Sequence, residues 1–190
     1  MAGLERTTGP AIEPLSLAEA KLHLRLDGEQ EDDLVAALIR AAREAAEGFT
    51  GRALIAQGFR LWLDRWPAGR RALDLPRPPL LAVDGVSTFD EDDQEAALDP
   101  ALWLADRVAT PGRLVLRAGA SAPLAGRAAN AIAVDYRAGY GSDPEDVPAP
   151  IRRGMAVLVG TLFESREVGG PAALPLGVQA LWAPYRVVRL

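Results

Sequence analysis

Apolar residues recur at helical spacing twice in the first part of the chain. Ser16 and Glu19 stand three residues apart in the pattern of a capping box, and Leu17 begins the apolar spacing of a short helix. A longer helix is predicted over 31–50, and Gly51 follows it as a typical C-terminal stop. Its apolar arc is wide for a surface helix and consists of two adjoining rows. The rows are Leu34, Leu38, Ala41, Ala45 and Phe49, and beside them Val35, Ile39, Ala42 and Ala46.

A third helix is predicted from Pro148 to Glu167, and it is apolar on two sides. One side carries Ile151, Met155, Leu158 and Leu162, and the adjoining side carries Ala156, Val159 and Phe163. Such a helix is either enclosed by its own chain or buries its second side against another subunit. The pattern leaves both explanations open.

Between these helical regions the pattern changes to short alternating segments separated by Pro, Gly and Asp, which is typical of strands joined by turns. One acidic stretch among them, DEDDQEAALDPALW, is predicted to be a solvated loop. The predicted strand segments are FRLWLDRW, RALDLP, LLAVDGVSTF, GRLVLRAG and NAIAVDYRAGY.

The order of these elements predicts an α+β fold in a single domain that spans residues 1–190. A small α-helical bundle forms the core at 14–56 and 147–168, and a β-rich insertion occupies 57–141. An extended C-terminal tail follows at 171–190.

Composition then limits the possible functions. The chain has 21 basic and 26 acidic residues, a net charge of −5, which argues against binding nucleic acid through its phosphates. It has no cysteine, which excludes disulfides, thiolate zinc sites and cysteine nucleophiles. No signal peptide pattern opens the sequence, and no apolar run approaches the ~18 residues of a membrane helix. We therefore expect a soluble protein that stays in the compartment where it is made, without a membrane partner.

The sequence gives little indication of a metal-binding site. His23, the single histidine, lies on a short helix among leucines and an arginine, so a structural or surface role is favoured. Asp90 and Asp92 alternate like the ligands of a calcium loop, but that loop needs glycine at its sixth position and glutamate at its twelfth. Those positions hold Glu95 and Ala101, so no calcium site is expected.

The sequence gives equally little indication of a catalytic site. The glycine-rich segment 138–143 lacks the lysine and hydroxyl of a phosphate loop, so it is interpreted as a strand-to-helix turn. An enzyme would need a site made of carboxylates alone, such as one using Asp135 or Asp143. No serine has the setting of a hydrolase nucleophile; the four considered are Ser87, Ser121, Ser142 and Ser165.

Two features of the sequence are explained either by contacts within the chain or by contact with another molecule. Arg152 and Arg153 lie in the first turn of the third helix, where the helix dipole opposes cations by ~0.3–1 kcal/mol each. Either Glu145 and Asp146 neutralise them or they face another molecule. The segment 171–190 contains no acidic residue and is rich in the Trp, Tyr and Arg typical of interface hot spots, so it either folds back onto the core or docks on another protein.

The ordered set of segments resembles the head-tail connector (adaptor) family of long-tailed phages, and most closely the adaptors of alphaproteobacterial gene transfer agents. No single motif is specific, and the resemblance depends on their order along most of the chain. One departure is Phe163, where the family would lead us to expect tyrosine. The segments are LSLAEAKLHLRLD, LDLPRPPLLAVDGV, IAVDYRAGYG, VPAPIRRGMAVLVGTLFESRE and LWAPYRVVRL.

The resemblance implies a structural protein without catalytic residues or cofactors, located in a virion or phage-like particle at the head-tail interface. About twelve copies would form a ring between the portal protein and a stopper or tail-side connector. DNA would pass through the lumen without specific binding. The portal-docking candidates are Leu181, Trp182, Pro184, Tyr185, Arg186, Val187, Val188 and Leu190. The subunit-interface candidates are Leu34, Leu38, Ile151, Arg152, Arg153, Met155, Val159 and Phe163.

A second hypothesis is a protein-binding module or regulator of the same α+β plan that acts outside any virion. It differs from the connector hypothesis in its consequence for assembly. Deleting Pro184 to Leu190 would leave particle assembly intact in a regulator and would impair it in a connector.

Overall fold

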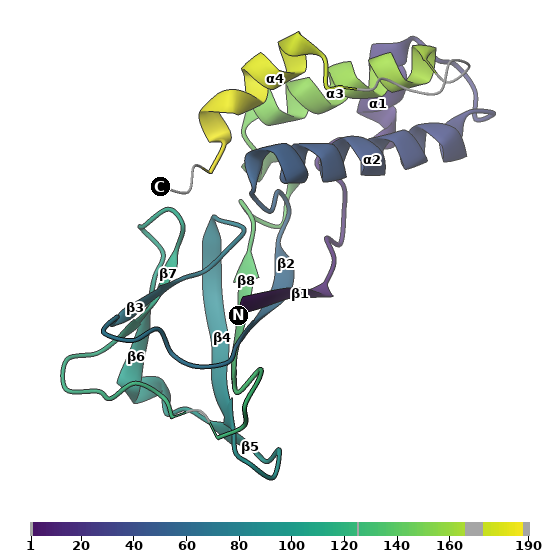
Figure 1. The fold of residues 1–190 in the computed structure, drawn as a ribbon. Coiled ribbons are helices and arrows are strands. Elements are labelled where there is room, and N and C mark those ends of the chain that lie inside the picture. Colours follow the sequence, from purple (N-terminus) through teal and green to yellow (C-terminus); the bar gives the residue numbers. More distant parts are fainter. Residues whose placement is uncertain (1, 125, 166–172, 188–190) are drawn as a thin grey trace. The chain divides into compact units, whose positions relative to one another are not determined.

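The computed structural model describes residues 2–124, 126–165 and 173–187, and the chain forms two compact units. The β-rich unit comprises Met1–Pro10 and Ala56–Tyr140, and the helical unit comprises Ala11–Ile55 and Gly141–Leu190. Figure 1 shows the helices and strands of each unit, and the predicted α+β class is confirmed. That all 190 residues form a single domain stays a prediction.

The two N-terminal helices of the helical unit form where the sequence predicts them. Helix α1 (Leu17–Leu24) begins with the predicted capping box, in which the Glu19 amide donates to Ser16 Oγ at 3.2 Å and the Ser16 amide donates to Glu19 Oε2 at 2.9 Å. Helix α2 (Asp32–Thr50) ends at Gly51, whose φ of 73° is the left-handed conformation that glycine adopts without strain.

The two apolar rows of α2 differ in burial. Val35, Ile39, Ala42 and Ala46 are fully enclosed and form the core-facing row. Of the other row, Leu34, Leu38, Ala45 and Phe49 are half-buried and Ala41 is exposed. Helix α2 therefore keeps a partly apolar margin at the surface of the helical unit.

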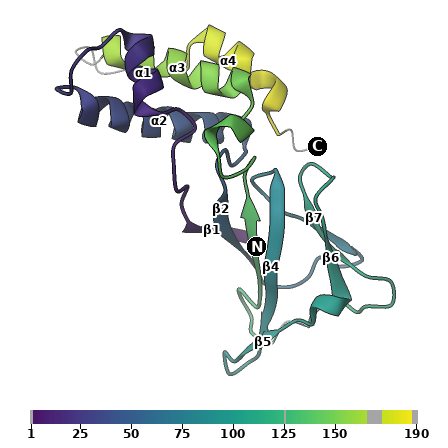
Figure 2. The same ribbon diagram turned by 180° about the vertical axis from the view of Figure 1, so that it is seen from behind.

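The third helix, α3 (Ala149–Glu164), is buried along one broad face, which includes Ile151, Met155, Leu158 and Val159. It packs against α1, α2 and a further helix, α4 (Leu176–Trp182), which runs along α3 in Figures 1 and 2. Helix α4 is followed by the 3-10 turn η3 (Ala183–Tyr185), so the described part of the tail contains helix where extended chain was expected. On the second apolar side of α3, Ala156 and Val159 are buried and Phe163 is half-buried, which favours enclosure over subunit contact for most of that side.

The described residues of the β-rich unit form two antiparallel sheets. The five-stranded sheet has the order β1 (Ala2–Thr8), β2 (Gln57–Leu63), β8 (Ile132–Ala138), β4 (Leu80–Phe89) and β5 (Glu95–Ala97). The three-stranded sheet has the order β3 (Ala72–Asp74), β7 (Arg113–Leu116) and β6 (Trp103–Asp106), and the strands of both sheets are labelled in Figure 1.

The five predicted strand segments are confirmed as β2, β3, β4, β7 and β8. In β2 every second side chain is buried, from Gln57 to Leu63, as a half-exposed strand requires. On β8 the buried Tyr136 hydroxyl donates to the Pro76 carbonyl at 2.9 Å, and burial raises the pKa of this phenol.

The acidic stretch predicted as a solvated loop is more ordered than expected. Residues 95–97 form strand β5 on the edge of the larger sheet, and the 3-10 turn η1 (Pro100–Leu102) leads into β6. The hairpin turn is held by Asp90, whose Oδ1 accepts from the amides of Asp92 and Gln94 at 2.9 and 2.8 Å. All three residues of β5 are exposed, so the sequence shows no alternation of apolar and polar positions there. The acidic residues beside it are typical of a turn, and the strand was therefore not predicted.

The glycine-rich segment after β8 is a turn into α3, as predicted. A short 3-10 helix, η2 (Pro144–Asp146), follows it, and Asp146 Oδ2 accepts from the Asp143 amide at 3.1 Å. A Cβ on Gly141 would lie 1.8 Å from that same oxygen, so only glycine fits beside this carboxylate.

We expect Glu19→Gln to destabilise the helical unit at neutral pH by less than about 1 kcal/mol, because glutamine keeps the capping box but loses the charge that faces Arg152. Hydrogen bonds from the Ser16 amide and hydroxyl, and the charge of Arg152, hold the pKa of Glu19 below its ordinary value. A lowered folded-state pKa adds stability above the unfolded pKa of about 4.3, and this stability is lost as the pH falls through the folded pKa. Thermal melts of both proteins at neutral and acid pH should therefore show a gap that closes in acid. An equal gap at both pH values would contradict this assignment.

Candidate functional site

The C-terminal segment is fixed to the helical unit by one aromatic side chain. Trp182 is 0% exposed, and its indole Nε1 donates to the Ile151 carbonyl at 3.1 Å. A Cβ on Gly154 would lie 2.2 Å from the same nitrogen, so the indole occupies the space that the missing side chain leaves on α3. The Phe49 ring of α2 lies 6.0 Å from the Trp182 ring. Trp182 thus stabilises the contact of α4 with both α2 and α3.

After α4 the chain returns to the C-terminal end of α2. The Val187 amide donates to the Thr50 carbonyl at 2.8 Å, and Arg52 Nε donates to the Tyr185 carbonyl at 2.6 Å. The Arg186 guanidinium lies 5.6 Å from the centre of the Phe49 ring, within cation–π distance. The last described residues are therefore bound to a helix end that is distant in sequence.

The eight portal-docking candidates fall into different environments. Pro184 and Arg186 are exposed, and Leu181, Tyr185 and Val187 are half-buried. Trp182 faces inward and contributes to the fold of the unit. Val188 and Leu190 lie outside the described residues. No acidic residue occurs in 173–187, so the described surface of this segment is apolar with one cation, Arg186.

The subunit-interface candidates also separate by burial. Ile151, Met155 and Val159 are 0% exposed and belong to the interior of the helical unit. Leu34, Leu38 and Phe163 are half-buried at its surface.

The two arginines of α3 have different surroundings, and neither pairs with Glu145 or Asp146 in the described residues. Arg152 forms an ion pair with Glu19 of α1, and its Nε donates to the Pro14 carbonyl at 2.9 Å. Arg153 is exposed and has no ion-pair partner in the described part of the chain. Arg152 is thus neutralised by Glu19 of α1 and not by Glu145 or Asp146. The sequence did not indicate this pair, because tertiary packing brings α1 beside α3.

A buried ion-pair network was not predicted. Arg43 and Glu47 of α2 are only 4% and 3% exposed, and Arg43 Nη1 lies 3.3 Å from Glu47 Oε2. Arg43 Nε also donates to Glu13 at 2.8 Å, and Glu47 Oε1 accepts from the Leu54 amide at 3.2 Å. The network joins α2 to the segments before and after it within the helical unit.

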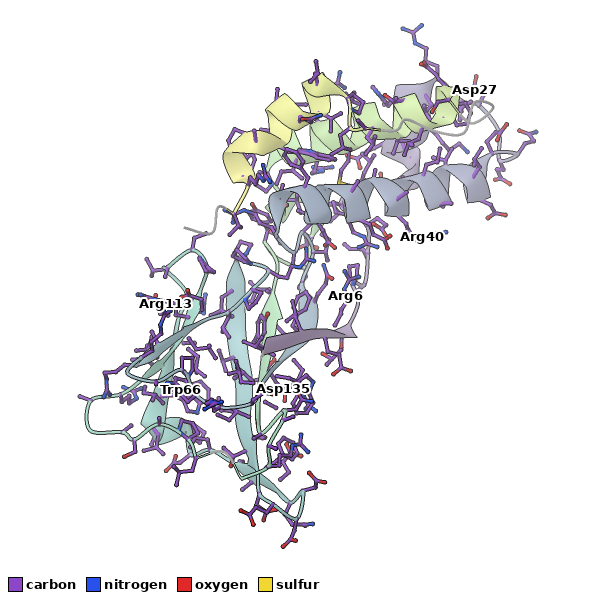
Figure 3. All side chains as sticks on the ribbon, in the orientation of Figure 1. Arg6, Asp27, Arg40, Trp66, Arg113 and Asp135 are labelled. Carbon is purple, nitrogen blue, oxygen red and sulfur yellow. The ribbon has the colours of Figure 1, made fainter. Side chains whose placement is uncertain are left out.

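The residues considered for catalysis have structural partners. Asp135, labelled in Figure 3, accepts from Arg60 Nε and Nη2 at 2.7 and 2.8 Å on the exposed side of the five-stranded sheet. Asp143 takes part in the turn before α3. His23 is exposed beside Gly160 of α3. Within residues 2–124, 126–165 and 173–187 no three histidine or carboxylate side chains gather as they would around a metal ion.

Two shallow hollows lie on the β-rich unit, with volumes of about 250 and 260 Å³. The first is lined by β2 and β8 around Asp135 and Arg137, and the second by Phe89, Ala96 and Leu124. Both are open, and the carboxylate of Asp135 is already engaged by Arg60. Neither has the convergent polar groups of an enzyme pocket.

None of the helices in the described residues has the length and apolar character that crossing a membrane requires.

These features are typical of a structural protein that works through protein contacts: an α+β chain with paired charges, shallow hollows and an acid-free, partly apolar C-terminal segment. Residues 14–97 match the model of the phage gp6-like head-tail connector protein family. No curated protein matches the sequence.

Solved structures similar to this chain come from gene transfer agent particles. A chain from the neck of an empty particle, with C6 symmetry, is 29% identical over 99% of this chain and 97% of its own length, with a TM-score of 0.84. A chain from the virion of a native particle is 30% identical over 98% and 96%, with a TM-score of 0.82. A chain from the neck of a native particle, with C12 symmetry, is 29% identical over 99% and 97%, with a TM-score of 0.82.

The chain belongs to the phage gp6-like head-tail connector family. It is a structural connector of the gene transfer agent type, and it acts at the head-tail interface of a phage-like particle.

Proposed function

We propose that copies of this connector form a ring between the portal protein and a stopper or tail-side component, and that the ring continues the path of the DNA. The observation that carries this proposal is the similarity over nearly the whole chain to neck chains with C6 and C12 symmetry. A ring built from identical chains uses two different faces of each copy at every contact. About twelve copies agree with the higher of these symmetries.

The C-terminal segment is the proposed portal-docking element. It presents Leu181, Pro184, Tyr185, Arg186 and Val187 at or near the surface, while Trp182 fixes α4 from inside. Apolar, aromatic and arginine side chains without nearby acidic residues suit a partner groove that is apolar with a carboxylate at its edge. Val188 and Leu190 extend this set by sequence alone.

Contacts between neighbouring copies are proposed for the partly apolar margin of the helical unit. Leu34 and Leu38 on α2, and Phe163 with Arg153 on α3, retain exposed area. Ile151, Met155 and Val159 would act behind them, by holding α3 in place.

The charge distribution suits passage of DNA without retention. Net charge is −5, and four guanidiniums of the β-rich unit pair with carboxylates; these are Arg60 with Asp135, Arg113 with Asp106, Arg127 with Asp93 and Arg137 with Asp84. Paired guanidiniums release few counterions from DNA, so binding that would slow its movement is weak. We propose no catalytic role for these carboxylates and no cofactor.

The test is electron microscopy of particles produced in cells that lack this protein. We expect DNA-filled heads without attached tails, because the step that joins the tail has lost its connector. Restoring the full-length protein should restore tails. Normal tailed particles in its absence would exclude the connector role and would favour the protein-binding module or regulator.

A further inference from the structure

The end of the described chain is bound to α2 by contacts that the packing of α4 does not require. Trp182 already secures α4 through Ile151 and Gly154. Tyr185 follows Trp182 by three residues, and its carbonyl accepts from Arg52 Nε at 2.6 Å. Two residues later the Val187 amide donates to the Thr50 carbonyl at 2.8 Å. These two hydrogen bonds act only on residues that follow the helix.

Arg52 is placed for this contact by the end of α2. Gly51 turns the chain in the left-handed conformation, and the position of its missing side chain lies 3.5 Å from Val187 Cβ. A side chain at 51 would therefore be strained by its φ of 73° as well as close to Val187. The residue after this turn then reaches the Tyr185 carbonyl across 133 positions of sequence.

We propose that Arg52 is a positioning residue for portal docking: its hydrogen bond to Tyr185 sets the direction in which the C-terminal segment meets the portal. This inference rests on the docking role proposed above. A segment held in its binding direction loses less conformational entropy when it binds, and the gain is repeated in every copy of a ring that docks as a whole. Arg52 acts through the backbone of Tyr185 and needs no contact with the portal.

The chain offers well-matched variants for a test. Arg52→Gln keeps an N–H donor at the same number of bonds from the backbone as Arg Nε, but removes the charge. Arg52→Ala removes both donor and charge. Arg40, which is exposed on α2 and labelled in Figure 3, provides Arg40→Ala as a control with the same change of charge. A chain ending at Ala183, which lacks Pro184 to Leu190 and keeps Trp182, tests the docking segment itself.

Binding of each full-length variant to the purified portal protein of the same particle is the first measurement. We expect Arg52→Ala to bind about tenfold more weakly and Arg52→Gln to bind within about threefold of the original chain, because the latter keeps the donor. Arg40→Ala should bind normally. Hydrogen exchange of the peptide that contains Val187 should be faster in Arg52→Ala and unchanged in Arg52→Gln, and the melting temperature should change little in any of them.

The outcomes separate the two proposals. If the chain ending at Ala183 binds the portal normally, the docking role of the segment is wrong whatever Arg52 does. If that chain fails to bind but Arg52→Ala binds normally, docking stands and the positioning role is overturned. If Arg52→Gln is as weak as Arg52→Ala, the charge is what matters, and positioning through the hydrogen bond is again overturned.

Discussion

Trp182→Ala should destabilise the helical unit by about 3–5 kcal/mol. The indole is fully enclosed, fills the space above Gly154 and satisfies the Ile151 carbonyl. Alanine leaves a cavity between α3 and α4 and removes a hydrogen bond. Chemical denaturation followed by helical circular dichroism measures this loss. Leu176→Ala is the control on the same helix, because Leu176 is 83% exposed and its loss should cost little.

The partnership of Trp182 with Gly154 can be tested by a double-mutant cycle. Gly154→Ala in the original chain places a methyl group 2.2 Å from the indole nitrogen and should destabilise it by about 1–3 kcal/mol. In the Trp182→Ala background the same methyl group enters the cavity and should cost far less. Additive losses would show that the two residues do not share this space.

Arg43→Met should destabilise the helical unit by about 3–5 kcal/mol, because it leaves the carboxylate of Glu47 buried without the guanidinium that faces it. Methionine fills much of the same volume, so the loss reports the charge rather than a cavity. Equilibrium denaturation at neutral pH is the measurement. Arg40→Met changes the same charge at an exposed site of α2 and should lie within about 0.5 kcal/mol of the original chain.

A compensating substitution identifies the cause of this loss. Adding Glu47→Gln to Arg43→Met removes the buried charge that has lost the Arg43 guanidinium and keeps an oxygen that accepts from the Leu54 amide. The double variant should regain part of the lost stability. If it is less stable than Arg43→Met alone, the buried charge is not the source of the loss.

Much of the fold was predictable because local chemistry and tertiary packing agree. Ser16 and Glu19 specify the start of α1, and Gly51 specifies the end of α2, through contacts within a few residues. The strands of the β-rich unit were predictable where one side is buried, as in β2, since alternation then marks the sequence. The connector family followed from the order of these elements, and the comparisons confirm it.

Other features have no local signal. Strand β1 carries one large apolar residue, Leu4, and the described side chains along it are exposed, so its place at the sheet edge comes from pairing with β2 alone. Strand β5 is also exposed along its length, and the acidic residues before it are typical of a turn, so the sequence does not indicate this strand.

The contacts that shape the candidate site are also long-range. The pairing of Arg152 with Glu19 and of Arg52 with Tyr185 spans 133 positions in each case. Gly154 gave no sign that it receives Trp182, because a glycine in a helical pattern indicates only that some close approach is possible. Periodicity identifies which faces are apolar, whereas the identity of the covering element depends on topology.

The helix that covers α3 follows the other helices of the helical unit along the sequence, so it is synthesised after them. The first stretch of the unit ends at Ile55, the larger part of the β-rich unit, Ala56–Tyr140, is synthesised next, and the helix that covers α3 follows only at 176–182. A nascent chain that is interrupted before α4 leaves an apolar surface of α3 uncovered. Such a surface favours capture by chaperones or degradation. A prematurely terminated product would therefore lack both the helix that covers α3 and the segment proposed to join a particle, and we expect such a product to be removed before assembly.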